Sequence, residues 1–281
     1  MPERIIVSLT TWSARVDNVP AVLDTIFAQT LPPDLVVLNV AYDLEIPQTV
    51  QDYLDQHHVE IYRCPDTKVY KKLIHTLKRY PDDCVISIDD DWLYPEGMIE
   101  DFVDVHKKYP DYPISGNKVV FCGMQCHCGC ASLTKAEYFG DYLCKIDGDV
   151  IDNCPSDDLV YTYFAYKNGH PYMRSCYEYF VNMESFNASE SYTYNHDVVS
   201  SLDKTYRYLV EKYGMLDIST SQYIRDNNLS QLLDDIVINR IADCCSLATS
   251  NAEKKIRNTI SYRIGRFFTF PFSRMRSLFQ K

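Results

Sequence analysis

Glycine is scarce in this sequence, with nine residues among 281. Neither the G-x-G-x-x-G pattern of dinucleotide-binding domains nor the G-x-x-x-x-G-K-[ST] pattern of P-loop proteins occurs, which excludes both glycine-rich phosphate loops. No apolar run approaches the roughly 18 residues that a membrane-spanning helix needs, so we expect no transmembrane segment. Internal repeats and low-complexity linkers are also absent.

Basic residues are too few to balance the acidic ones, and the net charge is −11. This argues against a nucleic-acid-binding surface spread over the molecule, and we expect no nucleic-acid partner. The eleven cysteines are irregularly spaced, and several, such as Cys64 and Cys84, lie in apolar runs. Because no secretory signal precedes the first apolar run, the pattern favours a reducing cytoplasm over a disulfide framework.

The first half of the chain alternates between short apolar runs and amphipathic segments. We expect strands at 4–10, 35–40, 59–64 and 84–88, with helices opening near Asp17 or Asn18, at Pro47 and at Val69. Further on we expect a helix at 95–109, a strand at 114–122 and a helix at 157–167. Strand–helix alternation predicts an α/β domain with a mostly parallel sheet, whose ligands bind beyond the carboxyl ends of the strands.

Three consecutive aspartates, Asp89, Asp90 and Asp91, follow the apolar run at 84–88. Two carboxylates about 4 Å apart repel by about 4 kcal/mol at an effective dielectric constant near 20, so a positive group must offset them. Mg²⁺ or Mn²⁺ suits such oxygen ligands. In an extended chain Asp89 and Asp91 would face one ion and Asp90 would point elsewhere. A solvated acidic turn is the alternative.

The other strand ends bring further polar and aromatic side chains to the same edge of the predicted sheet. A nucleoside diphosphate needs a stacking ring, polar groups for the base and ribose, and a cation. The candidates are Thr10, Thr11, Trp12, Arg15, Asp43, Asp66 and Lys72.

Several motifs together resemble GT-A-fold glycosyltransferases, and most closely the family-2-like bacterial enzymes that build surface polysaccharides and lipopolysaccharides. The resemblance covers roughly residues 4–175 and departs from the family at Lys68-Val69, where a Gly-Pro is usual, and at 128–135, where a Gly-Gly and a Tyr-Pro-Pro are usual. The motifs are Val7-Ser8-Leu9-Thr10-Thr11 with Trp12 and Arg15, Gln29-Thr30, Pro33-Asp34, Lys71-Lys72-Leu73, Ile88-Asp89-Asp90-Asp91 and Pro155-Ser156-Asp157-Asp158-Leu159.

The resemblance implies a hexosyltransferase that moves a sugar from a nucleotide-diphosphate donor to a glycan or lipid-linked acceptor. It implies a D-x-D metal site at Asp89 and Asp91 for Mn²⁺ or Mg²⁺, with Asp91 as the more direct ligand. Asp158 would be the base of an inverting reaction, with Asp157 as second choice. The remaining implied donor-site residues are Thr10, Thr11, Trp12, Arg15, Asp43, Asp66, Lys72, Asp89 and Asp90. From the residues alone, Asp157 and Asp158 also suit a helix N-terminus.

Two other functions remain open. A sugar nucleotidyltransferase usually has a glycine-rich loop after the first strand, where this chain has Thr10-Thr11-Trp12. A non-catalytic, cysteine-rich metal-binding module would use Cys122, Cys126, His127, Cys128 and Cys130, but their spacing lacks paired C-x₂₋₄-C knuckles. Cysteines at alternate positions would also share one strand face and pack as small hydrophobes.

The end of the chain differs in charge from the rest. Residues 252–281 hold eight Lys or Arg and one acidic residue, with five phenylalanines interleaved. This pattern favours a segment that lies on an anionic membrane, although packing on the acidic domain is the alternative. We therefore expect a GT-A catalytic domain at 1–198 and a helical extension at 199–281, peripheral on the cytoplasmic face of the membrane. Deleting the chain from Arg263 onward should abolish co-sedimentation with anionic liposomes.

Overall fold

A computed structural model describes residues 3–116, 120–121, 124–175, 181–182 and 198–216. All of them belong to one compact unit, Met1–Tyr223. No helix in this described part is long and apolar enough to cross a membrane. The basic, aromatic tail and most of the predicted extension lie outside the described residues, so the domain boundary at 198/199 and the membrane contact stay predictions.

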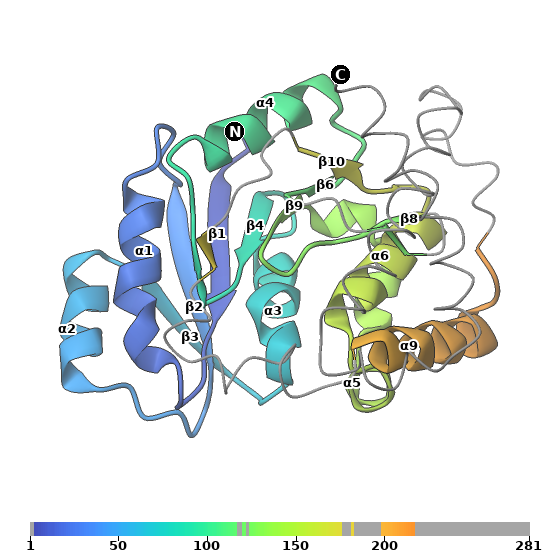
Figure 1. Cartoon of the computed structure of the whole chain (residues 1–281), viewed down its shortest axis with the longest axis horizontal. Coiled ribbons are helices and arrows are strands. Elements are labelled where there is room, and N and C mark those ends of the chain that lie inside the picture. The colour runs from blue at the N-terminus through green and yellow to red at the C-terminus, as the bar shows by residue number, and fades with distance from the viewer. Residues whose placement is uncertain (1–2, 117–119, 122–123, 176–180, 183–197, 217–281) are drawn as a thin grey trace, which may run out of the picture. The chain divides into compact units, whose positions relative to one another are not determined.

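A seven-stranded sheet forms the centre of the fold, in the order β10-β6-β9-β4-β1-β2-β3 (Figure 1). Every neighbouring pair is parallel except the two made by β9, which runs antiparallel to β4 and β6. The strands of this sheet are β1 (Ile5–Thr10), β2 (Leu35–Ala41), β3 (Glu60–Cys64), β4 (Cys84–Ile88), β6 (Ile114–Ser115), β9 (Ala131–Thr134) and β10 (Met173–Arg174). The mostly parallel sheet predicted from the sequence is confirmed.

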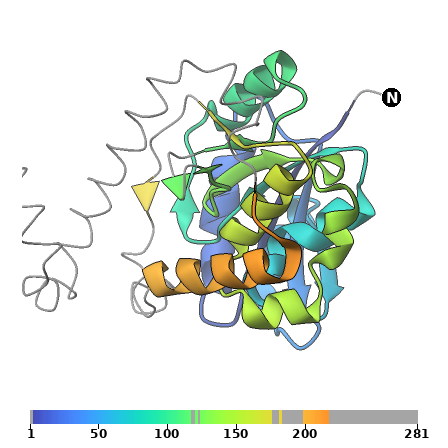
Figure 2. The same cartoon turned by 90° about the vertical axis from the view of Figure 1, so that its right-hand side faces the viewer.

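Helices cover both faces of the sheet (Figures 1 and 2). One face packs against α1, α2 and α4, and the other packs against α3, α5, α6 and α9. Their bounds are α1 (Val19–Phe27), α2 (Gln48–Gln56), α3 (Lys71–Arg79), α4 (Met98–Lys108), α5 (Gly148–Asn153), α6 (Asp157–Lys167) and α9 (Val198–Tyr213). The nearly continuous apolar runs of β1, β2 and β4 are thus explained, because both sides of these strands are buried.

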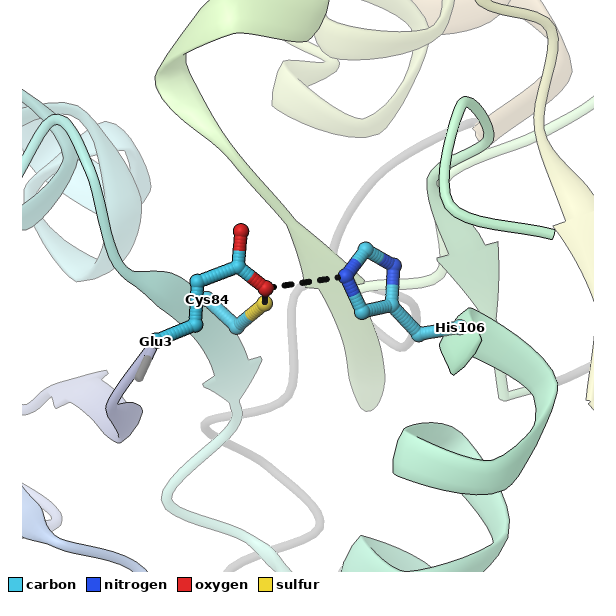
Figure 3. A group of neighbouring side chains, drawn as sticks. All are labelled: Glu3, Cys84 and His106. Carbon is cyan, nitrogen blue, oxygen red and sulfur yellow. Dashed lines mark hydrogen bonds and ion pairs between the residues drawn. The ribbon is translucent and has the colours of Figure 1, made fainter. Parts of the chain in front are cut away.

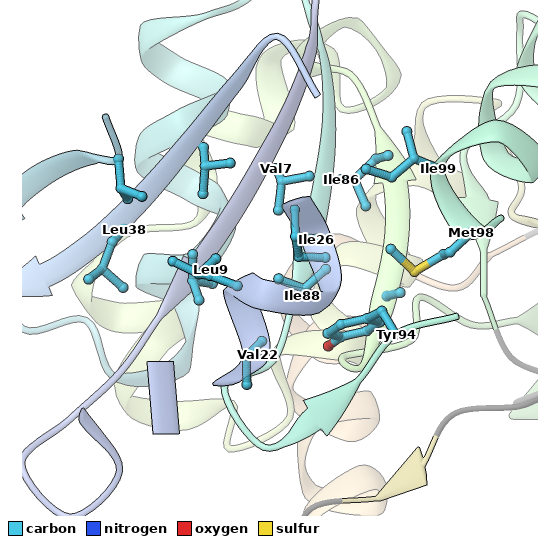
Figure 4. Close-up of a cluster of buried hydrophobic side chains, with 14 of the residues drawn as sticks. Val7, Leu9, Val22, Ile26, Leu38, Ile86, Ile88, Tyr94, Met98 and Ile99 are labelled. Carbon is cyan, nitrogen blue, oxygen red and sulfur yellow. The ribbon is translucent and has the colours of Figure 1, made fainter. Parts of the chain in front are cut away.

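The side chains of β1 point alternately to the two faces of the sheet, so this one strand contributes to the core on both faces. Val7 and Leu9 join the cluster under α1 and α4, whereas Ile6 joins the cluster under α3 and α6. Figure 4 shows Val7 and Leu9 beside Ile86 and Ile88 of β4 in the first of these clusters. Since all four are fully buried, the end of β4 is fixed on a packed core and cannot drift relative to the end of β1.

Two sequence predictions differ from the structure. The strand expected at 114–122 is divided, because β6 belongs to the main sheet while β7 (Val120–Phe121) pairs with β8 (Met124–Gln125) in a separate hairpin. The helix expected from Pro95 begins only at Met98, because β5 (Trp92–Leu93) and a turn come first. β5 pairs with β11 (Val181–Asn182) rather than with the central sheet.

Candidate functional site

Lys72 is the centre of a charged cluster at the carboxyl end of β4. It lies in the first turn of α3 and is only 3% exposed. Its ammonium donates to Asp89 Oδ1 at 2.9 Å and lies 3.2 Å from Asp157 Oδ2. Burial opposes the charge of Lys72, but the carboxylates of Asp157, Asp89 and Asp158 outweigh it and raise the Lys72 pKa well above its usual value. The lysine therefore stays cationic while buried.

A network of buried polar side chains fixes the backbone of Lys72. Ser8 Oγ on β1 donates to the Lys72 carbonyl oxygen at 2.5 Å and lies 2.6 Å from Thr76 Oγ1. Asn39 Nδ2 on β2 donates to Ser8 Oγ and Thr76 Oγ1 at 3.0 and 3.1 Å. Because Ser8, Asn39 and Thr76 are fully buried, the first turn of α3 is held against two strands in one position.

Asp157 and Asp158 reach the cluster from the first turn of α6. Ser156 caps this helix, and its side-chain oxygen accepts from Leu159 N at 3.3 Å. The positive end of the helix dipole favours carboxylates there. The Asp158 pKa is raised well above its usual value, mainly by burial and secondly by the negative charge of the adjacent Asp157. Asp158 Oδ1 is buried and has no hydrogen-bond partner among the described residues, although the whole side chain is 38% exposed.

The loop before β9 closes over these charges. Antiparallel pairing sets Ala131 opposite Ile88, so residues 128–130 pass directly beside Asp89. A Cβ atom at Gly129 would lie 3.1 Å from Asp89 Oδ2, 3.1 Å from Lys72 Nζ and 3.2 Å from Asp158 Oδ1. Glycine is therefore the residue that lets the backbone approach all three charged groups at once.

Tyr94 ties this loop to the end of β4. Its hydroxyl donates to Cys130 O at 2.6 Å and accepts from Asp89 N at 3.0 Å. Tyr94 is 4% exposed, so both bonds are shielded from water. The position of Asp89 thus depends on the loop that contains Gly129.

A second charged cluster lies on the loop after β1. Arg15 Nη1 is 3.0 Å from Asp90 Oδ1 and 2.7 Å from Asp91 Oδ2. Thr11 Oγ1 donates to Asp90 Oδ2 at 2.7 Å. Burial outweighs these contacts and raises the pKa of Asp90. Asp90 is therefore a structural link between the two loops, and its neighbour Asp91 shares the same arginine.

The extended geometry assumed for the aspartate triplet is wrong. The strand ends at Ile88, and residues 90–91 form a turn, so the rule that residues i and i+2 face the same way does not apply. Asp89 pairs with Lys72, whereas Asp90 and Asp91 both pair with Arg15. The positive charge that the triplet requires is supplied by Lys72 and Arg15, and the repulsion alone is no argument for a metal ion.

The predicted nucleotide-binding residues differ in exposure. Trp12 follows β1 and is 46% exposed, and Tyr42, which the sequence reasoning missed, follows β2 and is 66% exposed. Asp43 lies exposed on the same turn as Tyr42, and Asp66 pairs with Lys71 rather than Lys72. Thr10 Oγ1 donates to Asn39 O at 2.7 Å. Exposed aromatic rings at the carboxyl ends of two neighbouring strands are surfaces on which a base could stack.

The sequence predicts a strand for the cysteine-rich segment, but the structure has a loop there. Cys126, Cys128 and Cys130 lie in the loop and turn that precede β9, although all three are buried. Cys128 Sγ and Cys130 Sγ are 2.8 Å apart, and His127 Nδ1 contacts Tyr172 OH at 3.0 Å. In the described part of the chain, the group with three metal-ligand atoms within 4.8 Å of one another contains none of these residues.

Sequence reasoning found the charges of the site but missed Gly129 and Tyr94. The Cys-Gly-Cys sequence was considered for its thiols, whereas its glycine is the residue whose missing side chain leaves room for the charged cluster. The signal for Gly129 was its place where the resembling family has a Gly-Gly. Tyr94 belongs, as Tyr94-Pro95, to the segment that resembles the family, but the resemblance assigned no role to it.

No family model matches the chain, and no curated protein matches it. Among solved structures it is similar to a mannosyltransferase from Pyrobaculum calidifontis, determined with GDP-Man and Mn²⁺, at 15% identity and a TM-score of 0.57. That match covers 95% of this chain and 83% of the mannosyltransferase.

Two weaker matches accompany it. The S. aureus protein TarS (residues 1–349, with UDP) has 13% identity and a TM-score of 0.45, covering 66% of this chain and 62% of TarS. A cytidylyltransferase from Leptospira borgpetersenii has 12% identity and a TM-score of 0.44, covering 75% and 94%. The mannosyltransferase match and the mostly parallel sheet with its single reversed strand β9 lead to one conclusion: this chain has the GT-A fold of nucleotide-diphospho-sugar transferases.

Proposed function

We propose that this chain is a metal-dependent glycosyltransferase of the hexosyltransferase class. It would move a sugar from a nucleotide-diphosphate donor to a hydroxyl group of a glycan or lipid-linked acceptor, with inversion. The observation that carries the proposal is the contact of Asp89, Lys72 and Asp158 around Gly129 at the carboxyl end of β4. This is the edge at which α/β sheets bind ligands.

The oxygen donors at this edge suit Mn²⁺ or Mg²⁺. The Asp89 side chain is 30% exposed, and its Oδ2 is not the oxygen that bonds to Lys72. Small divalent ions are commonly held by one or two carboxylates together with waters and substrate phosphates. We propose Asp89 and Asp91 as the protein ligands, with Asp89 the better placed because Asp91 is only 13% exposed and pairs with Arg15. When bound, such an ion neutralises the charge of the departing diphosphate.

For Lys72 we propose a different role from the donor-site contact that the resemblance implies. Its ammonium is buried among carboxylates, so we assign it to holding Asp89 and Asp157 in position rather than to direct contact with the diphosphate. Trp12, with Tyr42 on the adjacent loop, offers rings for the base. Thr10, Asp43 and Asp66 remain proposals for the base and ribose, and Thr11, Arg15 and Asp90 would support that loop.

Asp158 is the proposed base. A general base must reach the proton that it takes, and partial exposure of the Asp158 side chain permits this. Its raised pKa makes the ionised carboxylate a stronger proton acceptor. Asp157 is the second choice, but it is 11% exposed and lies within ion-pair distance of Lys72.

Calorimetric titration with GDP and UDP, with and without Mn²⁺, tests the proposal. We expect Mn²⁺-dependent binding that Asp89→Asn weakens, whereas Asp104→Asn on the exposed face of α4 leaves it unchanged. Asp158→Asn should keep binding and lower donor turnover, measured as nucleoside diphosphate release, by about 10²- to 10⁴-fold. Nucleotide affinity that is the same with and without Mn²⁺, and the same in Asp89→Asn, would refute the metal role. Pyrophosphate release from a nucleoside triphosphate would identify a nucleotidyltransferase instead.

A further inference from the structure

A cluster of metal-ligating side chains lies at the opposite edge of the sheet from the candidate site. It consists of Glu3, just before β1, Cys84, the first residue of β4, and His106, in the last turn of α4 (Figure 3). One ligand atom from each lies within 4.8 Å of the other two. Cys84 and His106 are buried, and Glu3 is exposed, so the cluster opens to solvent on one side.

Two of the three spacings in the cluster match those of ligands around one tetrahedral ion, and the third, from Cys84 Sγ to His106 Nε2, is at most 4.8 Å. Glu3 Oε2 is 3.4 Å from Cys84 Sγ and 3.3 Å from His106 Nε2. Zinc–ligand distances of about 2.0–2.3 Å place neighbouring tetrahedral ligand atoms about 3.3–3.6 Å apart. The three atoms could therefore surround an ion with little movement of their side chains.

Tyr138 contacts the far side of the His106 ring. Its hydroxyl donates to Pro110 O at 2.7 Å and lies 3.3 Å from His106 Nδ1. The other ring nitrogen, Nε2, faces the Glu3 carboxylate at 3.3 Å. The ring is thus held between Tyr138 and Glu3, with Nε2 turned toward the other two ligand atoms of the cluster.

Other groups around the cluster suit a metal ion. Lys135 binds the second oxygen of Glu3, Oε1, which orients the carboxylate and leaves Oε2 turned toward Cys84 and His106. A hydrogen bond from the far nitrogen of a ligating histidine is the usual way in which proteins fix the ring of a metal ligand. Tyr138 OH, 3.3 Å from His106 Nδ1, is in position to accept this bond, and Tyr138 is 1% exposed.

We propose that Glu3 Oε2, Cys84 Sγ and His106 Nε2 bind a thiophilic divalent cation, zinc in the first place, with water as the fourth ligand. The ion would bind the thiolate, and the Cys84 proton would pass to solvent. Binding would connect the start of β1 with β4 and α4 and so stabilise the fold. This site is separate from the proposed catalytic one, and either can fail without the other.

Cobalt substitution tests which cysteine binds the metal. The full-length, reduced protein is titrated with Co²⁺ and then with Zn²⁺, and thiolate-to-cobalt charge-transfer absorption is recorded. We expect this absorption at one equivalent, its loss on adding Zn²⁺, its absence in Cys84→Ser, and its retention in Cys144→Ser, whose thiol is exposed. Retention in Cys84→Ser, or loss in Cys128→Ser, would place the ion elsewhere and overturn the proposal.

A second variant keeps the test valid should Cys84→Ser fail to fold. Glu3 is exposed, so Glu3→Gln should fold, as circular dichroism would verify. We expect zinc affinity, measured against a chromophoric chelator, to fall at least about tenfold. Unchanged affinity in this variant would overturn the proposal. Mn²⁺-dependent nucleotide binding should be the same in Glu3→Gln and in the unmodified chain.

Discussion

The aspartates near the two ends of strand β4 differ in how completely their oxygens are hydrogen-bonded. At the amino end, Asp83 accepts three hydrogen bonds from Arg4: from the backbone N and from Nε, both at 3.2 Å, and from Nη2 at 2.6 Å. At the carboxyl end, buried Asp158 Oδ1 has no hydrogen-bond partner within the described part of the chain. One aspartate is fully satisfied and the other is not.

This difference supports the proposal that the carboxyl end of β4 is the reactive one. A buried acceptor without a partner costs about 1–3 kcal/mol, and folded proteins seldom retain one where stability is the only requirement. The three carboxylates around Lys72 add charge that one ammonium cannot neutralise. The amino end holds the sheet together, whereas the carboxyl end retains unsatisfied carboxylates that a cation and a substrate hydroxyl could engage.

Replacing Lys72 with methionine should give the largest effect. The change leaves the buried Asp157 and the partly exposed Asp89 without their cation, and removal of one partner from a buried ion pair costs about 3–5 kcal/mol. We expect the free energy of unfolding in urea to fall by about this amount and donor turnover to be lost. Lys107→Met removes an exposed pair with Asp104 and should change neither quantity. Equal stability of the two variants would contradict the description of Lys72 as a buried cation.

Two buried tyrosines allow the ends of β4 to be compared directly. Tyr94→Phe removes the hydroxyl that joins Asp89 to Cys130, and Tyr138→Phe removes the one that joins His106 to Pro110. Each leaves buried groups unpaired, so we expect unfolding free energies lower by about 1–3 kcal/mol. Only Tyr94→Phe should also lower nucleotide turnover. A similar loss of turnover in both variants would show that the comparison of the two ends is wrong.

The fold could be predicted well because apolar runs and helix-start residues are both local features of the sequence. Apolar runs such as 84–88 mark strands that are buried on two faces, and their ends in a parallel sheet meet at one edge. The same reasoning predicts Lys72 and Asp89 at one edge of the sheet, and in the structure the two side chains form an ion pair. The alternation rule failed at Asp90 and Asp91 because a turn, which the apolar pattern does not report, begins after Ile88.

The contribution of the loop at 128–130 could not be predicted in the same way. It reaches the site because β9 pairs antiparallel with β4, at a separation of more than forty residues. A long-range pairing of this kind leaves no periodic pattern in the sequence. The three cysteines indicated thiol chemistry, yet it is the residue between two of them, Gly129, whose backbone passes beside Asp89, Lys72 and Asp158.

A methyl group at Gly129 should affect activity more than stability. Gly129→Ala would press on Asp89, Lys72 and Asp158 at 3.1–3.2 Å, and the ends of these side chains can yield by a few tenths of an ångström. Small displacements of catalytic groups can lower rates as much as hundredfold, so we expect turnover to fall about 10- to 100-fold. Gly148→Ala has nothing within 4 Å and serves as the control. Full activity in Gly129→Ala would mean that the loop is not part of the site.

Replacing His127, which lies beneath the carboxyl end of β4, should have the smallest effect, a change in how stability depends on pH. Burial, with help from the nearby Lys72, lowers the His127 pKa well below its usual value. The unfolded chain therefore takes up a proton at about pH 6.5, whereas the folded chain does so only at lower pH.

Stability from this group is thus present above about pH 6.5 and is lost as pH falls toward the folded pKa, at up to about 1.4 kcal/mol per pH unit. Urea unfolding between pH 7 and pH 5 should show a shallower decline in His127→Gln than in the unmodified chain. His58→Asn, at an exposed site with positive φ that asparagine tolerates, should leave the slope unchanged. An identical slope in His127→Gln would show that His127 can be protonated in the folded protein, and the cluster around Lys72 would then be more open to water than its burial implies.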